Sequence, residues 1–180
     1  MKIILKEEVD EFLKKDWKIL EDRNNFLIFQ SLDWNLKWLE KNKKEQDIKI
    51  FIIYENDQPI LIFPFCIVKK FSFKIIKWIG HDISDYLGPL VDSKYRDEKV
   101  KFNQIWNDIF KIIKSKCDLI YLEKQINHDI FFYNCLIKNL KCKKYDETYG
   151  VNFSNWAELK KTKNKTLQKF RWSKKKLSEI

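Results

Sequence analysis

The spacing of apolar residues predicts alternating helices and strands over much of the chain. Lys2–Leu5 is typical of a short strand. Apolar positions then recur every three to four residues between 8 and 22, which predicts an amphipathic helix. Ser31 is a candidate N-cap for a second, short helix. Two β-rich runs at 48–54 and 60–68, separated by a polar turn, predict a β-hairpin.

The rest of the chain continues this alternation. We expect further elements in this order: a strand at 73–79, a helix at 102–113, a strand at 119–122, a helix at 129–140, an extended segment at 145–153 and a lysine-rich helix at 155–178. Such an order is typical of an α/β or α+β fold with a mixed sheet. We expect residues 1–154 to form one domain and residues 155–180 to form a basic C-terminal helix.

Pro64 lies inside the second run of the expected hairpin. Proline has no N–H group to donate to a neighbouring strand, so it is normally confined to edge strands and bulges. The sequence therefore predicts an edge position or a bulge at Pro64.

Composition indicates a globular chain with a large positive charge. The 180 residues are 44% hydrophobic and 16% aromatic, which suits a domain with a substantial core. The formal net charge is +10, but only three of the 36 basic residues are arginine. Arginine is the preferred residue for bidentate contacts with phosphate and guanine. We therefore do not expect nucleic acid to be the partner.

Neither a membrane segment nor a metal site is expected. The longest apolar run, 60–68, is far shorter than the roughly 20 residues of a membrane helix. The N-terminal apolar stretch is too short for a signal peptide, so we expect a cytoplasmic location. The cysteines lack the paired spacing of zinc ligands, and we expect them to be free thiols. They are Cys66, Cys117, Cys135 and Cys142.

The stretch from Trp78 to Val91 contains two of the three glycines, at Gly80 and Gly88. Glycine in so glycine-poor a chain indicates a turn with special backbone geometry. In this turn, Asp85 and Tyr86 are candidates for binding a substrate amine or sugar hydroxyl. The alternative is that Asp85 caps the turn and Tyr86 packs on the sheet. His81 is a candidate general base, or else an ordinary surface histidine.

Two other features have a functional and a structural interpretation. Trp34 and Trp38 stand one helical turn apart and could stack on a sugar, or could belong to the core. The lysine-rich stretch at 155–178, with interleaved aromatic residues, could follow an anionic surface or could be a solvated helix face.

The order of several segments resembles the GNAT-fold acyltransferases of the CelD-like branch, associated with cellulose biosynthesis. These segments are Phe29-Gln30-Ser31-Leu32-Asp33-Trp34, Ile60-Leu61-Ile62-Phe63-Pro64-Phe65, the turn from Gly80 to Ser84-Asp85-Tyr86, Cys117-Asp118-Leu119-Ile120-Tyr121-Leu122, and the basic run from Lys169 to Leu177. The resemblance implies a mixed sheet flanked by helices and acyl transfer from acyl-CoA, such as acetyl-CoA, to an amine or hydroxyl acceptor. The acceptor could be a saccharide. The resemblance also makes Glu123 a candidate catalytic residue, because GNAT folds often place a catalytic carboxylate at the end of a strand.

The family resembles tandem GNAT domains, with a substrate-side half followed by a half that binds acyl-CoA. GNAT enzymes typically hold the CoA pyrophosphate with backbone N–H groups of a glycine-rich turn at a helix N-terminus. Gly80, Gly88 and Gly150 form no Gly-x-Gly pattern. We therefore expect this chain to be the substrate-side half, acting with a second GNAT domain or as a homodimer. The alternative function is a non-catalytic binding module for nucleic acid or anionic surfaces.

Overall fold

The structure is a computed structural model that describes residues 1–24, 26–42, 47–95 and 99–125. The backbone divides into residues 1–143 and 144–180, and the second unit lies wholly outside the described residues. The segments expected at 129–140, 145–153 and 155–178 also lie outside them. Those expectations, and the domain boundary after residue 154, stay predictions.

One mixed sheet contains every described strand. The strands are β1 (Lys2–Lys6), β2 (Asp47–Glu55), β3 (Gln58–Lys70), β4 (Phe73–Trp78), β5 (Leu90–Val91) and β6 (Leu119–Ile120). Their order is β1-β2-β3-β4-β6, with β5 paired to β3. All pairs are antiparallel except β4 and β6, which run parallel. The expected hairpin and the strand after it therefore share one sheet, as predicted.

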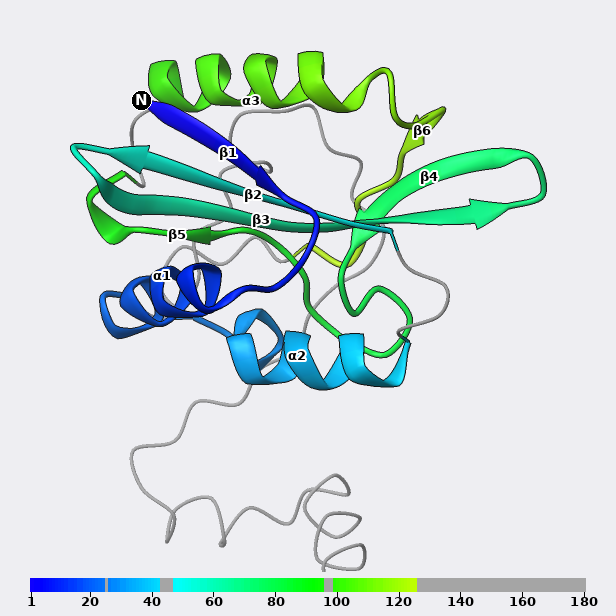
Figure 1. Ribbon diagram of the computed structural model, residues 1–180, viewed down its shortest axis with the longest axis horizontal. Helices are drawn as coiled ribbons and strands as arrows, with labels where there is room; N and C mark the ends of the chain where they lie inside the picture. Colours follow the sequence, from blue (N-terminus) through cyan, green and yellow to red (C-terminus); the bar gives the residue numbers. More distant parts are fainter. Residues whose placement is uncertain (25, 43–46, 96–98, 126–180) are drawn as a thin grey trace, which may run out of the picture. The chain divides into compact units, whose positions relative to one another are not determined.

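Three α-helices cover the two faces of this sheet. They are α1 (Glu11–Asp22), α2 (Leu32–Lys41) and α3 (Lys99–Ile113). Figure 1 shows α1 and α2 below the sheet and α3 above it. α1 begins three residues later than predicted, because the Asp10 carboxylate accepts a hydrogen bond from the Leu13 N–H and caps the helix there. The expected sheet flanked by helices is confirmed.

The core lies in two layers, one on each face of the sheet. In β2, Phe51 and Ile53 pack toward α3, whereas Ile50 and Ile52 pack toward α1 and α2. Successive side chains of a strand point to opposite faces, so a strand covered on both faces needs apolar residues at every position. This explains the uninterrupted apolar run of the hairpin. Cys66 is fully buried in this core, and burial raises the pKa of its thiol to about 12.

The prediction that Pro64 marks an edge or a bulge is wrong. β3 is an interior strand, and Pro64 lies opposite Ile50 of β2 without a bulge. On the other side of β3, the pairing with β5 ends at Ile62 and the pairing with β4 begins at Phe65. Pro64 occupies the gap between them, where its carbonyl accepts the Ile79 N–H and no neighbouring strand needs a donor.

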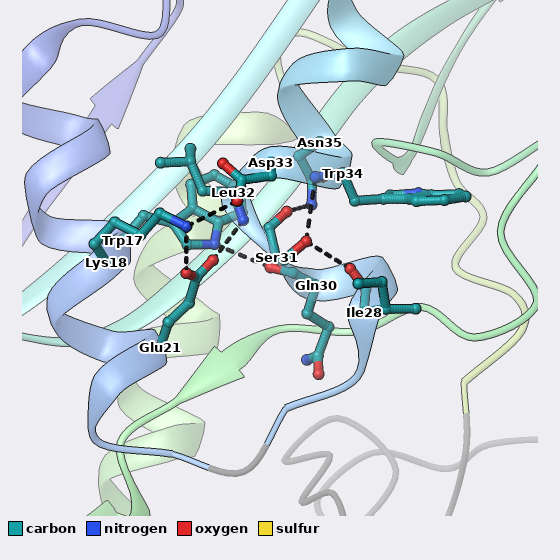
Figure 2. A network of polar contacts seen from close by, with 10 residues as sticks. All are labelled: Trp17, Lys18, Glu21, Ile28, Gln30, Ser31, Leu32, Asp33, Trp34 and Asn35. Carbon is teal, nitrogen blue, oxygen red and sulfur yellow. Dashed lines mark hydrogen bonds and ion pairs between the residues drawn. The ribbon is translucent and has the colours of Figure 1, made fainter.

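The start of α2 depends on a polar network reaching from α1 (Figure 2). Ser31 caps the helix as predicted, since its hydroxyl accepts the Trp34 N–H at 3.1 Å. The buried Glu21 carboxylate accepts the Leu32 N–H at 2.5 Å and pairs with Lys18 at 2.8 Å. Two α1 side chains therefore fix the position at which α2 begins.

We expect Glu21→Ala to lower the free energy of unfolding by about 1–3 kcal/mol, because it leaves a buried backbone N–H without an acceptor. Glu11→Ala is the matched control, since the Glu11 side chain is 86% exposed and, among the described residues, pairs with Lys14 alone. The control should cost less than about 0.5 kcal/mol. Urea denaturation of the two variants measures both values, and equal losses would contradict this role of Glu21.

Candidate functional site

Gly80 shapes the loop that follows β4. Its φ is +83°, in the left-handed region that favours glycine. Its carbonyl accepts the N–H groups of Ile83 and Ser84, which closes a tight turn. A Cβ atom at this position would lie 2.6 Å from the Ser84 hydroxyl oxygen. The turn therefore requires glycine for both its backbone angle and its packing.

Both tryptophans of α2 hold this loop by their indole N–H groups. Trp34 donates to the Ser84 hydroxyl at 3.0 Å, and Trp38 donates to the Asp82 carboxylate at 2.7 Å. Trp38 is 2% exposed and belongs to the core, whereas Trp34 is half-buried. The core interpretation therefore describes Trp38, and Trp34 alone of the two retains surface for a ligand.

Lys124 ties the two ends of the loop together. Its ammonium group donates to the His81 carbonyl at 2.9 Å, and its own carbonyl accepts the Leu87 N–H at 2.9 Å. β4 and β6 are parallel, so the residues that follow them emerge at the same edge of the sheet. That topology brings the segment after β6 against the loop after β4.

His81 is half-buried at this edge, with its ring edge-on to Trp38 at 5.7 Å between centroids. Burial is the main cause that lowers its pKa, and the nearby Lys77 ammonium lowers it further; Asp82, the Trp78 backbone and Glu123 act in the opposite direction. Nδ1 is the buried nitrogen of the ring. The imidazole is consequently neutral near pH 7.

Glu123 reaches the same edge from the end of β6. Its carboxylate lies 3.6 Å from the Lys77 ammonium, which also stands over the Tyr121 ring at 5.3 Å from its centroid. Glu123 therefore pairs with Lys77, and the charges of both residues act on the His81 imidazole. Sequence reasoning missed Lys77, because the sequence of β4 does not indicate which residues of another strand will lie beside this lysine.

Asp85 and Tyr86 lie in the second half of the loop. Asp85 is exposed, and its carboxylate has no hydrogen bond or ion pair within the described residues. The loop side chains that do have partners are Asp82 and Ser84, which accept the indole N–H groups of Trp38 and Trp34. The Tyr86 ring lies against Phe29, at 6.1 Å between centroids. The alternative in which Asp85 caps the turn has no contact to support it.

The described residues before α3 do not fit the pyrophosphate of an acyl-CoA. The Asp92 N–H donates to the Ile60 carbonyl, the Lys94 N–H to the Asp92 carboxylate and the Tyr95 N–H to the Asp92 carbonyl. These donors are therefore already used within the protein. The buried Asp92 carboxylate itself pairs with the Arg23 guanidinium at 3.8 Å, so that arginine is also engaged within the protein.

Residues 1–24, 26–42, 47–95 and 99–125 contain no group of three or more His, Cys, Asp or Glu side chains that could hold a metal ion. Of the helices in the same ranges, none has the length and apolar character needed to span a membrane. The lysine-rich stretch at 155–178 lies outside the described residues, and the binding module based on it stays a prediction.

No family model and no curated protein matches this chain. Three solved structures are similar to it. An aminoglycoside 6'-N-acetyltransferase from Acinetobacter haemolyticus is 15% identical, over 86% of this chain and 98% of that one, with a TM-score of 0.48. Glucosamine-6-phosphate N-acetyltransferase from Arabidopsis thaliana is 15% identical, over 84% and 100%, with a TM-score of 0.43. A transcriptional regulator from Bacillus halodurans is 12% identical, over 84% and 100%, with a TM-score of 0.45. These values assign the chain to no family.

We expect NMR titration to give His81 a pKa below the usual 6.5. Lys77→Met should raise this pKa, because it removes a positive charge that disfavours the imidazolium form. Lys74→Met is the matched control, since Lys74 lies on the same strand, is exposed and is not among the causes of the His81 shift. An equal rise in both variants would contradict a local effect of Lys77. With only two histidines in the chain, His81 can be assigned by substituting His128.

Proposed function

We propose that this chain is the acceptor-binding side of an acyltransferase that moves an acyl group from acyl-CoA to an amine, with its site at the shared edge of β4 and β6. The observation that carries the proposal is that the segment after β6 lies against the loop after β4, where Lys124 donates to the His81 carbonyl and Glu123 pairs with Lys77. The GNAT resemblance of the sequence, and the mixed sheet with helices on both faces that it implies, support the reaction class.

His81 is the proposed general base. An amine must lose a proton when its nitrogen becomes acylated, and a neutral imidazole can accept that proton. The lowered pKa keeps His81 neutral at pH 7 and somewhat below. Its Nδ1 is buried, so Nε2 is the nitrogen available to exchange a proton. Glu123 has an indirect role, since it balances the charge of Lys77 beside the imidazole.

The acyl donor is assigned to another unit. The N–H groups of Asp92, Lys94 and Tyr95, which precede α3, are used within the chain, and the sequence has no Gly-x-Gly pattern. A second GNAT domain or a second copy of the chain would have to supply the CoA site. The chemistry that acyl-CoA brings is an activated thioester carbonyl.

His81→Phe should lower kcat for acetyl transfer to an amine by about 10²–10⁴-fold, because the ring contact with Trp38 is kept while both nitrogens are lost. Release of CoA thiol from acetyl-CoA, in the protein at its natural length and with a panel of primary amines, measures this loss. In the unsubstituted protein, activity should fall as the pH drops through the lowered pKa of His81, and Lys77→Met should move that fall to higher pH.

His128→Phe is the matched control and should leave the acid side of the pH profile unchanged. No thiol release with any amine would contradict the proposed function. Full activity of His81→Phe would contradict the assignment of His81 as the base while leaving acyl transfer in place.

The isolated 180-residue chain should bind acetyl-CoA weakly or not at all, since the described residues offer no cradle for the pyrophosphate. Calorimetric titration of the chain with acetyl-CoA tests this directly, with CoA and free pantetheine as companion ligands. Micromolar binding of acetyl-CoA would show that the chain holds its own donor site, and the division into two units would then be wrong.

A further inference from the structure

Three aromatic rings from separate elements meet beside the loop after β4. Phe29 precedes α2, Trp34 belongs to α2, and Tyr86 lies in the loop; we call these three residues the aromatic cluster. The Phe29 and Trp34 rings are edge-to-face at 5.0 Å, and those of Phe29 and Tyr86 at 6.1 Å. All three side chains are half-buried. In Figure 2 the Trp34 ring points away from the polar network around Ser31, toward the loop.

The segments that form this cluster are free of positive charge. Residues 24–36 and 78–93 contain no lysine or arginine, although 36 of the 180 residues in the chain are basic. Hydrogen bonds join the two segments where the cluster forms, including the bond from Trp34 to Ser84. The fold thus gathers two exceptional stretches of a basic chain at one place on its surface.

The same segments contain four carboxylates, of which three have partners. Asp33 pairs with Lys18, Asp82 accepts the Trp38 indole N–H, and Asp92 pairs with Arg23 and accepts the Lys94 N–H. Asp85, next to Tyr86, is exposed and unpaired within the described residues. Lys124 contacts this loop, and its ammonium group donates a hydrogen bond to the His81 carbonyl.

We propose that the aromatic cluster and the Asp85 carboxylate bind an organic ammonium group, so that the acceptor is a cationic primary amine rather than a neutral hydroxyl compound. This identification of the acceptor rests on the proposed function. Ring faces attract a cation through their quadrupole, and a carboxylate adds a charge-assisted hydrogen bond. Neither segment has a basic side chain of its own that would repel a cation, and Lys18, Arg23 and Lys124, which contact the segments, each have an acceptor there.

The proposal also explains why a base, His81, lies nearby at the shared edge of β4 and β6. An amine that binds as an ammonium ion is unreactive until its nitrogen gives up a proton. His81 lies at the start of the loop that carries Asp85, and as a neutral imidazole it can take that proton and release it to solvent. The second proton, which the nitrogen loses as it is acylated, can then pass through the same imidazole to the departing CoA thiolate. Binding and deprotonation are thereby assigned to different residues of one loop.

n-Butylamine and n-butanol are suitable probes, because the amine is protonated at pH 7, as a lysine side chain is, whereas the alcohol is a neutral molecule of similar size. The full chain is titrated with each probe, without acyl donor, and the Trp34 indole N–H resonance is followed by NMR. Butylamine should shift this resonance in a saturable way, and butanol should not. Trp34→Phe assigns the resonance.

Asp85→Asn should weaken butylamine binding about tenfold, within what a hydrogen bond to a charged group contributes. Phe29→Leu should weaken it a few-fold, as expected for one exposed cation–π contact. Asp108→Asn is the matched control, since it removes one charge from a surface carboxylate on α3, across the sheet, and should leave the affinity unchanged.

Equal binding of butanol and butylamine, or an unchanged affinity in Asp85→Asn, would overturn the ammonium site. These results are separable from those on acyl transfer. Saturable butylamine binding without thiol release from acetyl-CoA would support the ammonium site and contradict the proposed function. Acetyl transfer to amines that is unaffected by Asp85→Asn would support the proposed function and contradict the ammonium site.

Discussion

Two indole N–H groups hold the candidate site in place. Trp34 and Trp38 lie one turn apart on α2, and they donate to Ser84 and Asp82 in the loop after β4. A buried indole N–H requires an acceptor, so the position of α2 dictates where these two loop residues lie. Gly80 meets that demand with a left-handed backbone and no side chain to collide with Ser84. The position of His81 follows from this arrangement.

The position of α2 is itself set by α1. Glu21 accepts the first N–H of α2, and the Trp17 indole donates to the Gln30 carbonyl at 3.0 Å just before the helix. A chain of contacts therefore leads from α1 through α2 to the loop. From the other side, Lys124 holds both ends of the loop by its ammonium and carbonyl groups. The loop is thus fixed by elements on either side of it in space, which suits a site that must position a proton acceptor.

The net charge of the chain and the charges near the candidate site give different information. The formal charge of +10 describes the whole chain and gives little information about the candidate site. Locally, Lys77 and Glu123 form a pair beside His81, and the loop further on has the unpaired Asp85. Exposed charges separated by more than about 10 Å are largely screened by salt. The local pattern is therefore the one that a bound ligand would experience.

The sequence by itself determined the elements and much of the fold class. Periods of two and of three to four residues identified the β2–β3 hairpin, α1 and α3, and Ser31 marked the start of α2, because local spacing and capping depend on neighbours in the chain. It also marked the Gly80 turn through the rarity of glycine. Tertiary structure decided why Pro64 is tolerated, since that depends on a gap between two strands that pair with the same side of β3. It also decided that Trp38 is buried, and that Glu123 pairs with Lys77. These outcomes depend on contacts between different strands and helices, from 13 positions apart for Phe65 and Trp78 to 46 for Lys77 and Glu123, and no local pattern encodes which strand lies beside β4.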